Sequence, residues 1–164
     1  MHADSVKLPD SLRFNTLIKK RDVYSGGGIT PDYFVPIDTS DISEYFKKIN
    51  RGGHLNGFAL KYVNANRKKL NNKFSSFSLY KKEMIVDDQL IEEFKDYVSS
   101  EDSSIIFNKE DYTISEQLIK TRLKGNIALN LWGYAEFYEV FNDRNEELQK
   151  ALKLLQSKKD LFKN

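Results

Sequence analysis

Apolar residues recur at helical spacing through most of the chain from residue 40 onward. Ile42, Tyr45, Phe46 and Ile49 follow the i, i+3, i+4, i+7 spacing that is typical of one buried helix face. The same spacing predicts further helices over 55–69, 77–84, 88–98, 109–131, 134–141 and 144–155. The expected fold class is therefore mainly α, a helical bundle of about five to seven helices.

Polar residues and glycines mark where these helices begin and end. Ser40 or Asp41, followed by Glu44, is expected to cap the first helix, and Gly52-Gly53 to end it. Asp87 is expected to cap a later helix.

Towards the C-terminus three more boundaries are expected. Ser99 to Ser104 forms a polar loop, and Gly133 marks a bend. Asp143 with Glu146 forms a capping box that opens the last helix.

The first 38 residues follow a different pattern. All three prolines and the run Gly26-Gly27-Gly28 lie there, whereas residues 39–164 contain no proline. Tyr33-Phe34-Val35 is β-prone but lies between Pro31 and Pro36, so it allows at most one short strand. We therefore predict an extended N-terminal arm over residues 1–38 and a C-terminal helical domain over residues 39–164.

Composition excludes several classes of function. The 164 residues contain no cysteine, so no disulfide, thiol nucleophile or cysteine-based metal site is available. A net charge of +2 gives no electrostatic preference for nucleic acid or an anionic membrane. The longest charge-free run, over 125–135, is about half of the roughly 20 residues that a transmembrane helix requires, so we expect no transmembrane segment.

Catalysis by a Ser-His-Asp arrangement would need one of the two histidines. His2 lies at the terminus, and His54 at the start of a helix, where a surface or capping histidine is more common than a catalytic base. A lysine base would need to be desolvated, and the lysines are expected on polar helix faces. We therefore assign no catalytic, cofactor-binding or metal-ligating residue and expect no cofactor.

Two further patterns favour structural roles over binding. The glycines at 26–28 are followed by Ile29-Thr30-Pro31, in which the proline disfavours a helix start, and this favours a turn over a phosphate site. The basic runs Arg67-Lys68-Lys69 and Lys158-Lys159 are short and lack interleaved aromatic residues, so we predict no nucleic-acid binding.

Aromatic residues gather near residue 135, at Trp132, Tyr134, Phe137, Tyr138 and Phe141. Core packing explains such a cluster more often than a ligand groove does. If part of it is exposed, it marks a surface for another domain or for self-association.

The segment from Gly27 to Pro36, with the sequence GGITPDYFVP, resembles the C-terminal processing peptidases, also called tail-specific proteases. In that family a G-[IV]-x-P-D-x-x-[VI]-P stretch closes the protease core. The segments at 9–12, 24–28, 107–112 and 118–124, with Leu131-Trp132, are similar to long family members of Bacteroidetes-type bacteria.

The resemblance implies a serine endopeptidase with a Ser-Lys dyad, a PDZ domain and a location in the periplasm or cell envelope. Neither the Gly-Ser-Ala-Ser type motif of the nucleophile nor the Phe-Gly-Lys-Gly type motif of the lysine occurs in this chain. We therefore interpret the chain as a non-catalytic C-terminal helical domain, itself inactive, whose partners are the core and PDZ domains of a parent peptidase that acts on protein substrates. The alternative is a helical protein-interaction or oligomerisation module.

Overall fold

A computed structural model describes residues 9–18, 20, 22–25, 33 and 35–157 of the chain. The chain divides into two compact units. One is Asp38–Asn145, and the other combines Met1–Ile37 with Glu146–Asn164.

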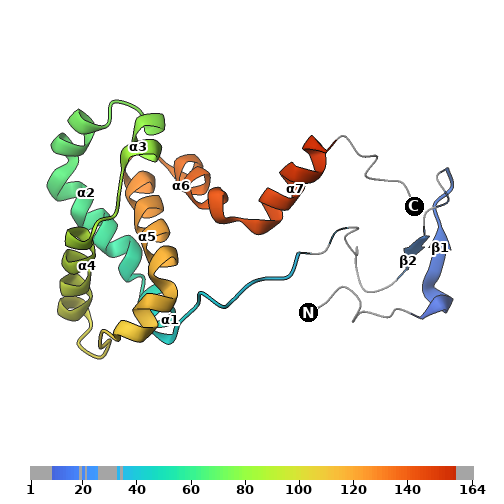
Figure 1. Ribbon diagram of the computed structural model, residues 1–164, viewed down its shortest axis with the longest axis horizontal. Coiled ribbons are helices and arrows are strands. Elements are labelled where there is room, and N and C mark those ends of the chain that lie inside the picture. The colour runs from blue at the N-terminus through green and yellow to red at the C-terminus, as the bar shows by residue number, and fades with distance from the viewer. Residues whose placement is uncertain (1–8, 19, 21, 26–32, 34, 158–164) are drawn as a thin grey trace. The chain divides into compact units, whose positions relative to one another are not determined.

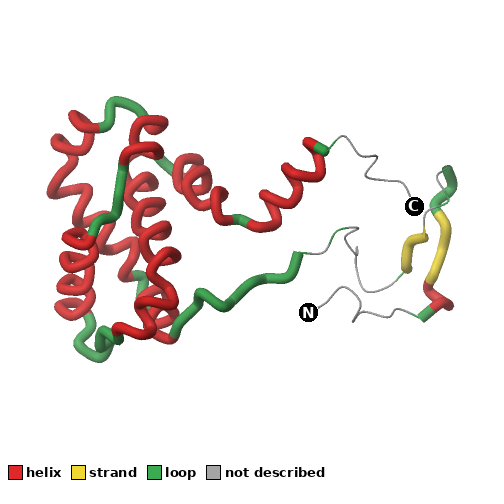
Figure 2. Tube along the Cα trace, viewed as in Figure 1, coloured by secondary structure: helices red, strands yellow, loops and turns green. Residues whose placement is uncertain are grey.

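The unit Asp38–Asn145 is built of helices joined by short loops (Figure 2). Its elements are α1 (Glu44–Arg51), α2 (His54–Lys73), α3 (Phe77–Glu83), α4 (Asp88–Glu101), α5 (Lys109–Leu131), α6 (Tyr134–Phe141) and the short 3-10 helix η3 (Asn142–Arg144). Helix α5 packs against α1, α2 and α6, and α4 packs against α2 (Figure 1). The predicted mainly α fold class is confirmed.

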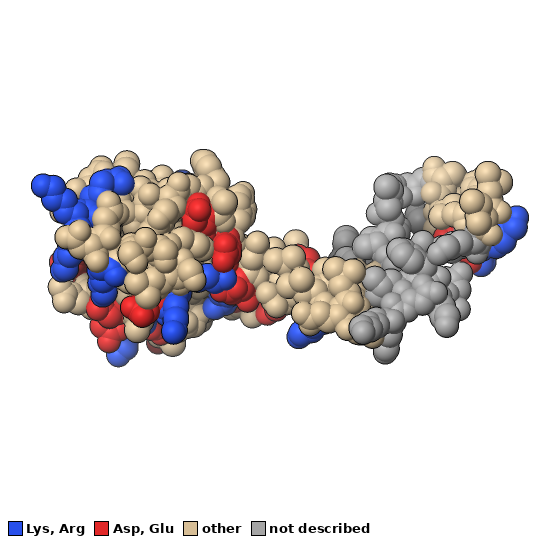
Figure 3. Space-filling model, turned by 90° about the horizontal axis from the view of Figure 1, so that it is seen from above, with Lys and Arg blue, Asp and Glu red and all other residues tan. Residues whose placement is uncertain are grey.

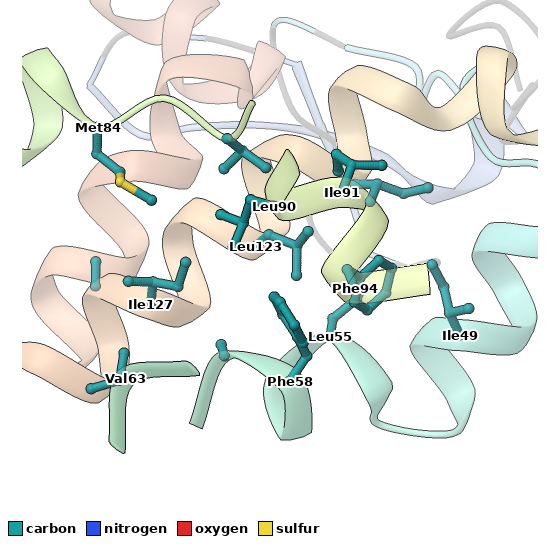
Figure 4. Packing of buried hydrophobic residues seen from close by; sticks show 14 of the residues in the cluster. Ile49, Leu55, Phe58, Val63, Met84, Leu90, Ile91, Phe94, Leu123 and Ile127 are labelled. Atoms are coloured by element: carbon teal, nitrogen blue, oxygen red, sulfur yellow. The ribbon is translucent and has the colours of Figure 1, made fainter. Parts of the chain in front are cut away.

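The core of this unit lies where α1, α2, α4 and α5 meet. Ile49, Phe94, Leu123 and Ile127 come from three of these helices and are at most 1% exposed (Figure 4). Phe58 of α2 packs edge-on against the ring of Phe94 at 5.4 Å between centroids. Burying each such side chain stabilises the fold by about 1.5–3 kcal/mol relative to leaving it exposed, so the unit has a core of its own.

The cap of helix α1 lies two or three residues later than expected. Ser43 is the cap, because its Oγ accepts a hydrogen bond from the Phe46 N–H at 3.2 Å. The prediction of Ser40 or Asp41 was wrong. The Asp41 carboxylate instead accepts a hydrogen bond from the Arg144 guanidinium at 2.9 Å.

Helix α5 completes this cap from a distant part of the chain. The Asp111 carboxylate accepts a hydrogen bond from the Tyr45 N–H at 3.0 Å, and the Ser115 hydroxyl accepts one from the Ser43 N–H at 2.9 Å. These N–H groups have no partner within α1, so α5 fixes where α1 starts.

Helix α4 is longer than predicted. Asp87 caps it as expected, with its Oδ1 accepting a hydrogen bond from the Leu90 N–H at 2.9 Å. The helix continues to Glu101, so the predicted loop at 99–104 is wrong for its first three residues. The continuation is consistent with the burial of Val98, whose carbonyl accepts a hydrogen bond from the Asp102 N–H at 2.9 Å.

The C-terminal boundaries agree with expectation only in part. Gly133, with φ 153°, separates α5 from α6 as the predicted bend. The predicted capping box is wrong, because Asp143 lies within η3 and its carboxylate contacts the Lys81 Nζ at 3.1 Å. Helix α7 (Glu146–Gln156) follows and has no buried residue.

The described N-terminal residues contain a short antiparallel hairpin. After the 3-10 helix η2 (Asp10–Leu12), strand β1 (Arg13–Asn15) pairs with β2 (Asp22–Tyr24). An ion pair between the side chains of Arg13 and Asp22 joins the strands. The strand predicted at 33–35 is wrong for Tyr33 and Val35, which lie outside any strand, and Phe34 is not among the described residues.

Tyr45 of α1 makes the stability of the helical unit decrease with rising pH in the alkaline range. Its side chain is 3% exposed, and burial raises the pKa of its hydroxyl to about 12. The unfolded chain releases this proton at about pH 10. The contribution of Tyr45 is therefore complete below pH 10 and is lost as the pH rises towards 12.

We expect the urea midpoint, followed by circular dichroism, to fall between pH 10 and pH 12, and to fall less in Tyr45→Phe. Tyr80 and Tyr112 act in the same direction, because burial also raises their pKa values, so part of the decline remains. Substitution of the exposed Tyr134 by Phe is the control. An identical decline in Tyr45→Phe and the wild type would contradict the assignment.

Candidate functional site

An open groove lies between α2 and α4. It has a volume of ≈ 460 Å³. Its lining consists of Phe58, Lys61, Tyr62, Ala65 and Asn66 from α2, and Glu93, Asp96, Tyr97 and Ser100 from α4.

Helical spacing brings these side chains to one surface. The α2 residues recur at intervals of three or four from Phe58 to Asn66, and the α4 residues do the same from Glu93 to Ser100. Side chains at this spacing lie above one another on the same helix face. Each wall is therefore a continuous ridge of one helix.

The floor of the groove is aromatic. The Phe58 ring stacks on Tyr62 with centroids 6.0 Å apart and lies 5.7 Å from the centroid of Tyr97. Burial, reinforced by the carboxylates of Glu93 and Asp87, raises the pKa of the Tyr62 hydroxyl. The floor is thus apolar and uncharged at neutral pH.

A second depression of ≈ 180 Å³ continues the groove. It shares Tyr62 and Glu93 with the first and extends to Lys73 at the end of α2 and Asp87 at the start of α4. The two helices therefore run antiparallel along it. From Phe58 to Lys73 the rise of an α-helix gives a length of about 22 Å. We call the two depressions together the α2/α4 groove.

The two walls of the α2/α4 groove carry opposite charges. The α2 wall presents Lys61, Lys69 and Lys73, whereas the α4 wall presents Asp87, Glu93 and Asp96. Among the described residues no ion pair joins these six side chains. The groove therefore separates a basic ridge from an acidic one.

Gly57 and Tyr97 meet at one end of this groove. A Cβ at residue 57 would overlap the Tyr97 hydroxyl, so the absence of a side chain lets the tyrosine ring approach α2. Glycine within a helix costs about 0.5–1 kcal/mol relative to alanine. Close packing of the ring and helix propensity are therefore in conflict at this position.

We expect Gly57→Ala to stabilise the protein by about 0.5–1 kcal/mol in a Tyr97→Phe background, and by less, or not at all, in the wild type. Urea denaturation of the four proteins of this double-mutant cycle measures the coupling. Equal effects of Gly57→Ala in both backgrounds would contradict the contact.

Of the two histidines, His54 lies among the described residues, and it is buried and not at the surface as predicted. It is the first residue of α2 and is only 9% exposed, so a surface or capping role is wrong. Its ring packs against Tyr97 with centroids 6.4 Å apart, and its buried Nε2 has no hydrogen-bond partner. Within Asp38–Asn145, no serine hydroxyl forms a hydrogen bond with His54 or with a lysine Nζ.

Lys124 of α5 is an exception to the lysines expected on polar faces. Burial lowers the pKa of its ammonium group. Its Nζ donates a hydrogen bond to the Lys81 carbonyl at 2.6 Å, while the Tyr80 hydroxyl donates one to the Lys124 carbonyl at 2.7 Å. This reciprocal pair ties α3 to α5, which is a structural role.

The aromatic cluster near residue 135 divides between core and surface. Trp132 packs 5.0 Å from the Tyr80 ring centroid. Phe137 lies over Gly125, where a Cβ would come within 3.1 Å of the ring. Tyr134 and Tyr138 are 71% and 55% exposed. We call the exposed side of α6 that carries these two tyrosines the α6 face.

The remaining sequence motifs yield no site in the described part of the chain. His2, the run Gly26–Gly28 and Lys158-Lys159 lie outside the described residues. Arg67 donates a hydrogen bond to the Asn130 carbonyl at 3.3 Å. No group of three His, Asp or Glu side chains among the described residues is placed to hold a metal.

Two properties of the described helices bear on the expected partners. None of them combines the length and the apolar character that crossing a bilayer requires. Figure 3 shows positive and negative side chains interspersed over one face of the helical unit.

The groove residues were not among the residues predicted to be functional. A signal was present, because Lys61, Lys69 and Lys73 recur on the same helix face as apolar residues, and Glu93 and Asp96 do so on α4. Periodicity within each helix, however, does not reveal that the two ridges lie beside each other.

Comparison with known proteins identifies a family. No curated protein and no solved structure shows significant similarity to the chain. The profile of a family of unknown function, DUF8443, matches residues 45–133, which is 89 of the 164 residues. The match includes all of the α2/α4 groove and ends before α6. The chain therefore belongs to this family of unknown function, DUF8443.

Proposed function

We propose that the helical unit is a non-catalytic protein-binding module that binds its partner in the α2/α4 groove. The observation that carries the proposal is the groove itself, with its aromatic floor and two oppositely charged walls that are not paired with each other. A surface of this kind gives a partner both apolar contact and charged groups to recognise.

The proposed partner is a serine peptidase of the C-terminal processing family in the periplasm or cell envelope. This part of the proposal rests on the resemblance of the segment from Gly27 to Pro36 and on the absence of both catalytic motifs from the chain. Chemistry is then done by the peptidase core, and the helical unit contributes binding.

Two experiments test whether the chain is the non-catalytic part of a larger peptidase, one on the natural reading frame and one on the isolated chain. We expect the frame to continue upstream of Met1 into the Gly-Ser-Ala-Ser and Phe-Gly-Lys-Gly type motifs. We also expect a serine-reactive fluorophosphonate to label no single serine of the purified chain. Labelling of one specific serine would contradict a non-catalytic role, and an upstream stop codon would contradict the parentage.

The binding site is tested with one substitution made on two surfaces. Ala65 lies exposed in the groove and Ala135 lies exposed on α6, so an arginine at either position leaves the core intact. In titration calorimetry with the purified core of the upstream peptidase, we expect Ala65→Arg to weaken binding at least about tenfold and Ala135→Arg to leave it unchanged. The reverse pattern would contradict the groove as the site.

A second candidate function is self-association through the α6 face, favoured by the exposure of Tyr134 and Tyr138. Light scattering of the wild type and of Tyr138→Glu tests it. A dimer that the substitution converts to a monomer would support this function, whereas a monomeric wild type at about 100 μM would contradict it.

A further inference from the structure

We infer that the α2/α4 groove takes an amphipathic helix whose apolar stripe is flanked by acidic residues on the side next to α2 and by basic residues on the side next to α4. This inference rests on the proposed function and specifies the chemistry of the partner.

The shape of the groove favours a helix as the occupant. Its walls are two antiparallel helices about 22 Å long, which matches roughly four turns of a third helix. Helices pack by placing the ridge of one into the groove formed by others. A partner helix that packs on α2 and α4 in this way would add a third helix to their antiparallel pair.

An extended peptide fits the same surface poorly. Strand addition needs an exposed sheet edge with free N–H and C=O groups. Along most of the groove the walls are turns of α2 and α4 whose backbone groups are paired within each helix, and helix termini line it only near Lys73 and Asp87. The backbone of an extended peptide would lose water without gaining partners, whereas a helix satisfies its own backbone.

The aromatic floor sets the apolar stripe of the occupant. Phe58, Tyr62 and Tyr97 form one contiguous surface near the middle and one end of the groove. Towards the other end Leu70, Phe74, Met84 and Leu90 also line the depression, but they are at most 7% exposed, and most of the surface there is polar. Leucine-sized residues at i, i+3 and i+4 would contact the aromatic end of this floor, and polar residues of the occupant would face the rest of the groove.

The charges of the walls set the flanks of the occupant. Lys61 pairs with no carboxylate in the described part of the chain, and its Nζ lies over the Tyr97 ring at 5.2 Å from the centroid. On the facing wall, Glu93 accepts a hydrogen bond from the neutral Gln89 side chain at 3.1 Å, and no described cation pairs with it. Carboxylates near α2 and cations near α4 would give both walls charged partners at a partly desolvated surface.

The acidic wall also argues against nucleic acid in this groove. Asp87, Glu93 and Asp96 stand opposite the three lysines. A phosphate backbone paired with the lysines would face these carboxylates within the same groove, and like charges repel each other. A helix carrying both signs meets no such repulsion.

The test uses four designed peptides of 18 residues and the purified chain. Three of the peptides carry the same leucine stripe, and in the fourth, the serine peptide, serine replaces each leucine of the stripe. The first peptide and the serine peptide have glutamate on one flank of the stripe and lysine on the other. The second peptide has lysine on both flanks, and the third has glutamate on both flanks. Fluorescence anisotropy at low and high salt measures binding.

We expect the glutamate/lysine peptide to bind at least about tenfold more tightly than either single-sign peptide, and the serine peptide not to bind. High salt should reduce the preference. Ala65→Arg should abolish binding, and Ala135→Arg should leave it unchanged. Equal binding of the three leucine peptides, or binding unaffected by Ala65→Arg, would overturn the inference.

A charge-reversed groove provides a gain-of-function test. The side chains of Lys61, Lys69 and Lys73 are exposed, so Lys61→Glu, Lys69→Glu and Lys73→Glu together make both walls acidic without disturbing the core. We expect this variant to prefer the peptide with lysine on both flanks by about tenfold, with an unchanged circular dichroism spectrum. An unchanged peptide preference would overturn the inference.

Failure of this inference differs from failure of the proposed function. If no designed peptide binds while the peptidase core binds and Ala65→Arg blocks it, the groove is a docking site for a partner of other chemistry and only the inference falls. If Ala65→Arg blocks neither the binding of a designed peptide nor the binding of the peptidase core, the inference and the proposed function are both contradicted. A wild-type dimer that Ala65→Arg dissociates would replace the partner helix with a second copy of this chain.

Discussion

Ser115→Val is expected to lower the free energy of unfolding by about 2–6 kcal/mol. Ser115 is 0% exposed, and its hydroxyl accepts the Ser43 N–H at 2.9 Å and lies 2.7 Å from the Asp41 carbonyl oxygen. Valine leaves the buried Ser43 N–H without an acceptor, which costs about 1–3 kcal/mol. The larger side chain also overpacks a filled site, at a further cost of about 1–3 kcal/mol.

Urea denaturation followed by circular dichroism measures the effect. Ser99→Val is the matched control, because Ser99 is an exposed helical serine of α4 and carries the same helix-propensity change. Ser115→Ala should give an intermediate loss. A loss below about 1 kcal/mol for Ser115→Val relative to Ser99→Val would show that the contact between α1 and α5 is not needed for stability.

Tyr80→Ala is expected to cost about 3–5 kcal/mol and to release α3 from α5. Tyr80 is 0% exposed, and its ring packs on Phe74 and Trp132, with centroids 5.2 and 5.0 Å away. Its hydroxyl donates the hydrogen bond that holds the Lys124 carbonyl. The substitution therefore opens a cavity and leaves a part-buried acceptor without its donor.

Trp132 reports on this change, because it is the only tryptophan in the chain. We expect its emission to shift to longer wavelength in Tyr80→Ala as water reaches the ring, and the urea midpoint to fall. Tyr80→Phe isolates the hydroxyl and should cost about 1 kcal/mol. Tyr134→Ala, at an exposed aromatic residue, serves as the control, and an equal loss there would contradict the packing explanation.

The position of the helices could be predicted because their signals are local. Leu90, Phe94 and Val98 repeat at the spacing of α4, and Asp87 caps it as expected. The long helix α5 also lies where its apolar pattern indicated, and the structure gives a reason for Gly125 within it. The Phe137 ring of α6 packs over Gly125, so the glycine leaves room for this ring although glycine has a low helix propensity.

The cap of α1 shows where local signals stop. Asp41 and Ser43 are both good capping residues by type. Arg144 pairs with the first, and Ser115 hydrogen-bonds the second, from positions 103 and 72 residues away in the sequence. No pattern within a window of a few residues carries that information.

The candidate site depends even more on packing. The lysines of α2 and the carboxylates of α4 are each ordinary polar side chains on an amphipathic helix. They form a groove only because the core around Phe58 and Phe94 places the two helices side by side and antiparallel. His54 is buried for a related reason, since the ring of Tyr97 on α4 packs against it.

The amino-acid sequence by itself determined the fold class, because the periodicity of apolar residues fixes which segments become helices and which face each one buries. It also determined that Asp87 and Gly133 are boundaries, because capping and backbone freedom act within a turn. The tertiary structure alone decided the start of α1, the burial of His54 and the existence of the α2/α4 groove. Each of these arises from contacts between residues far apart in the chain, whose energies depend on how the helices pack and not on the residues that surround them in sequence.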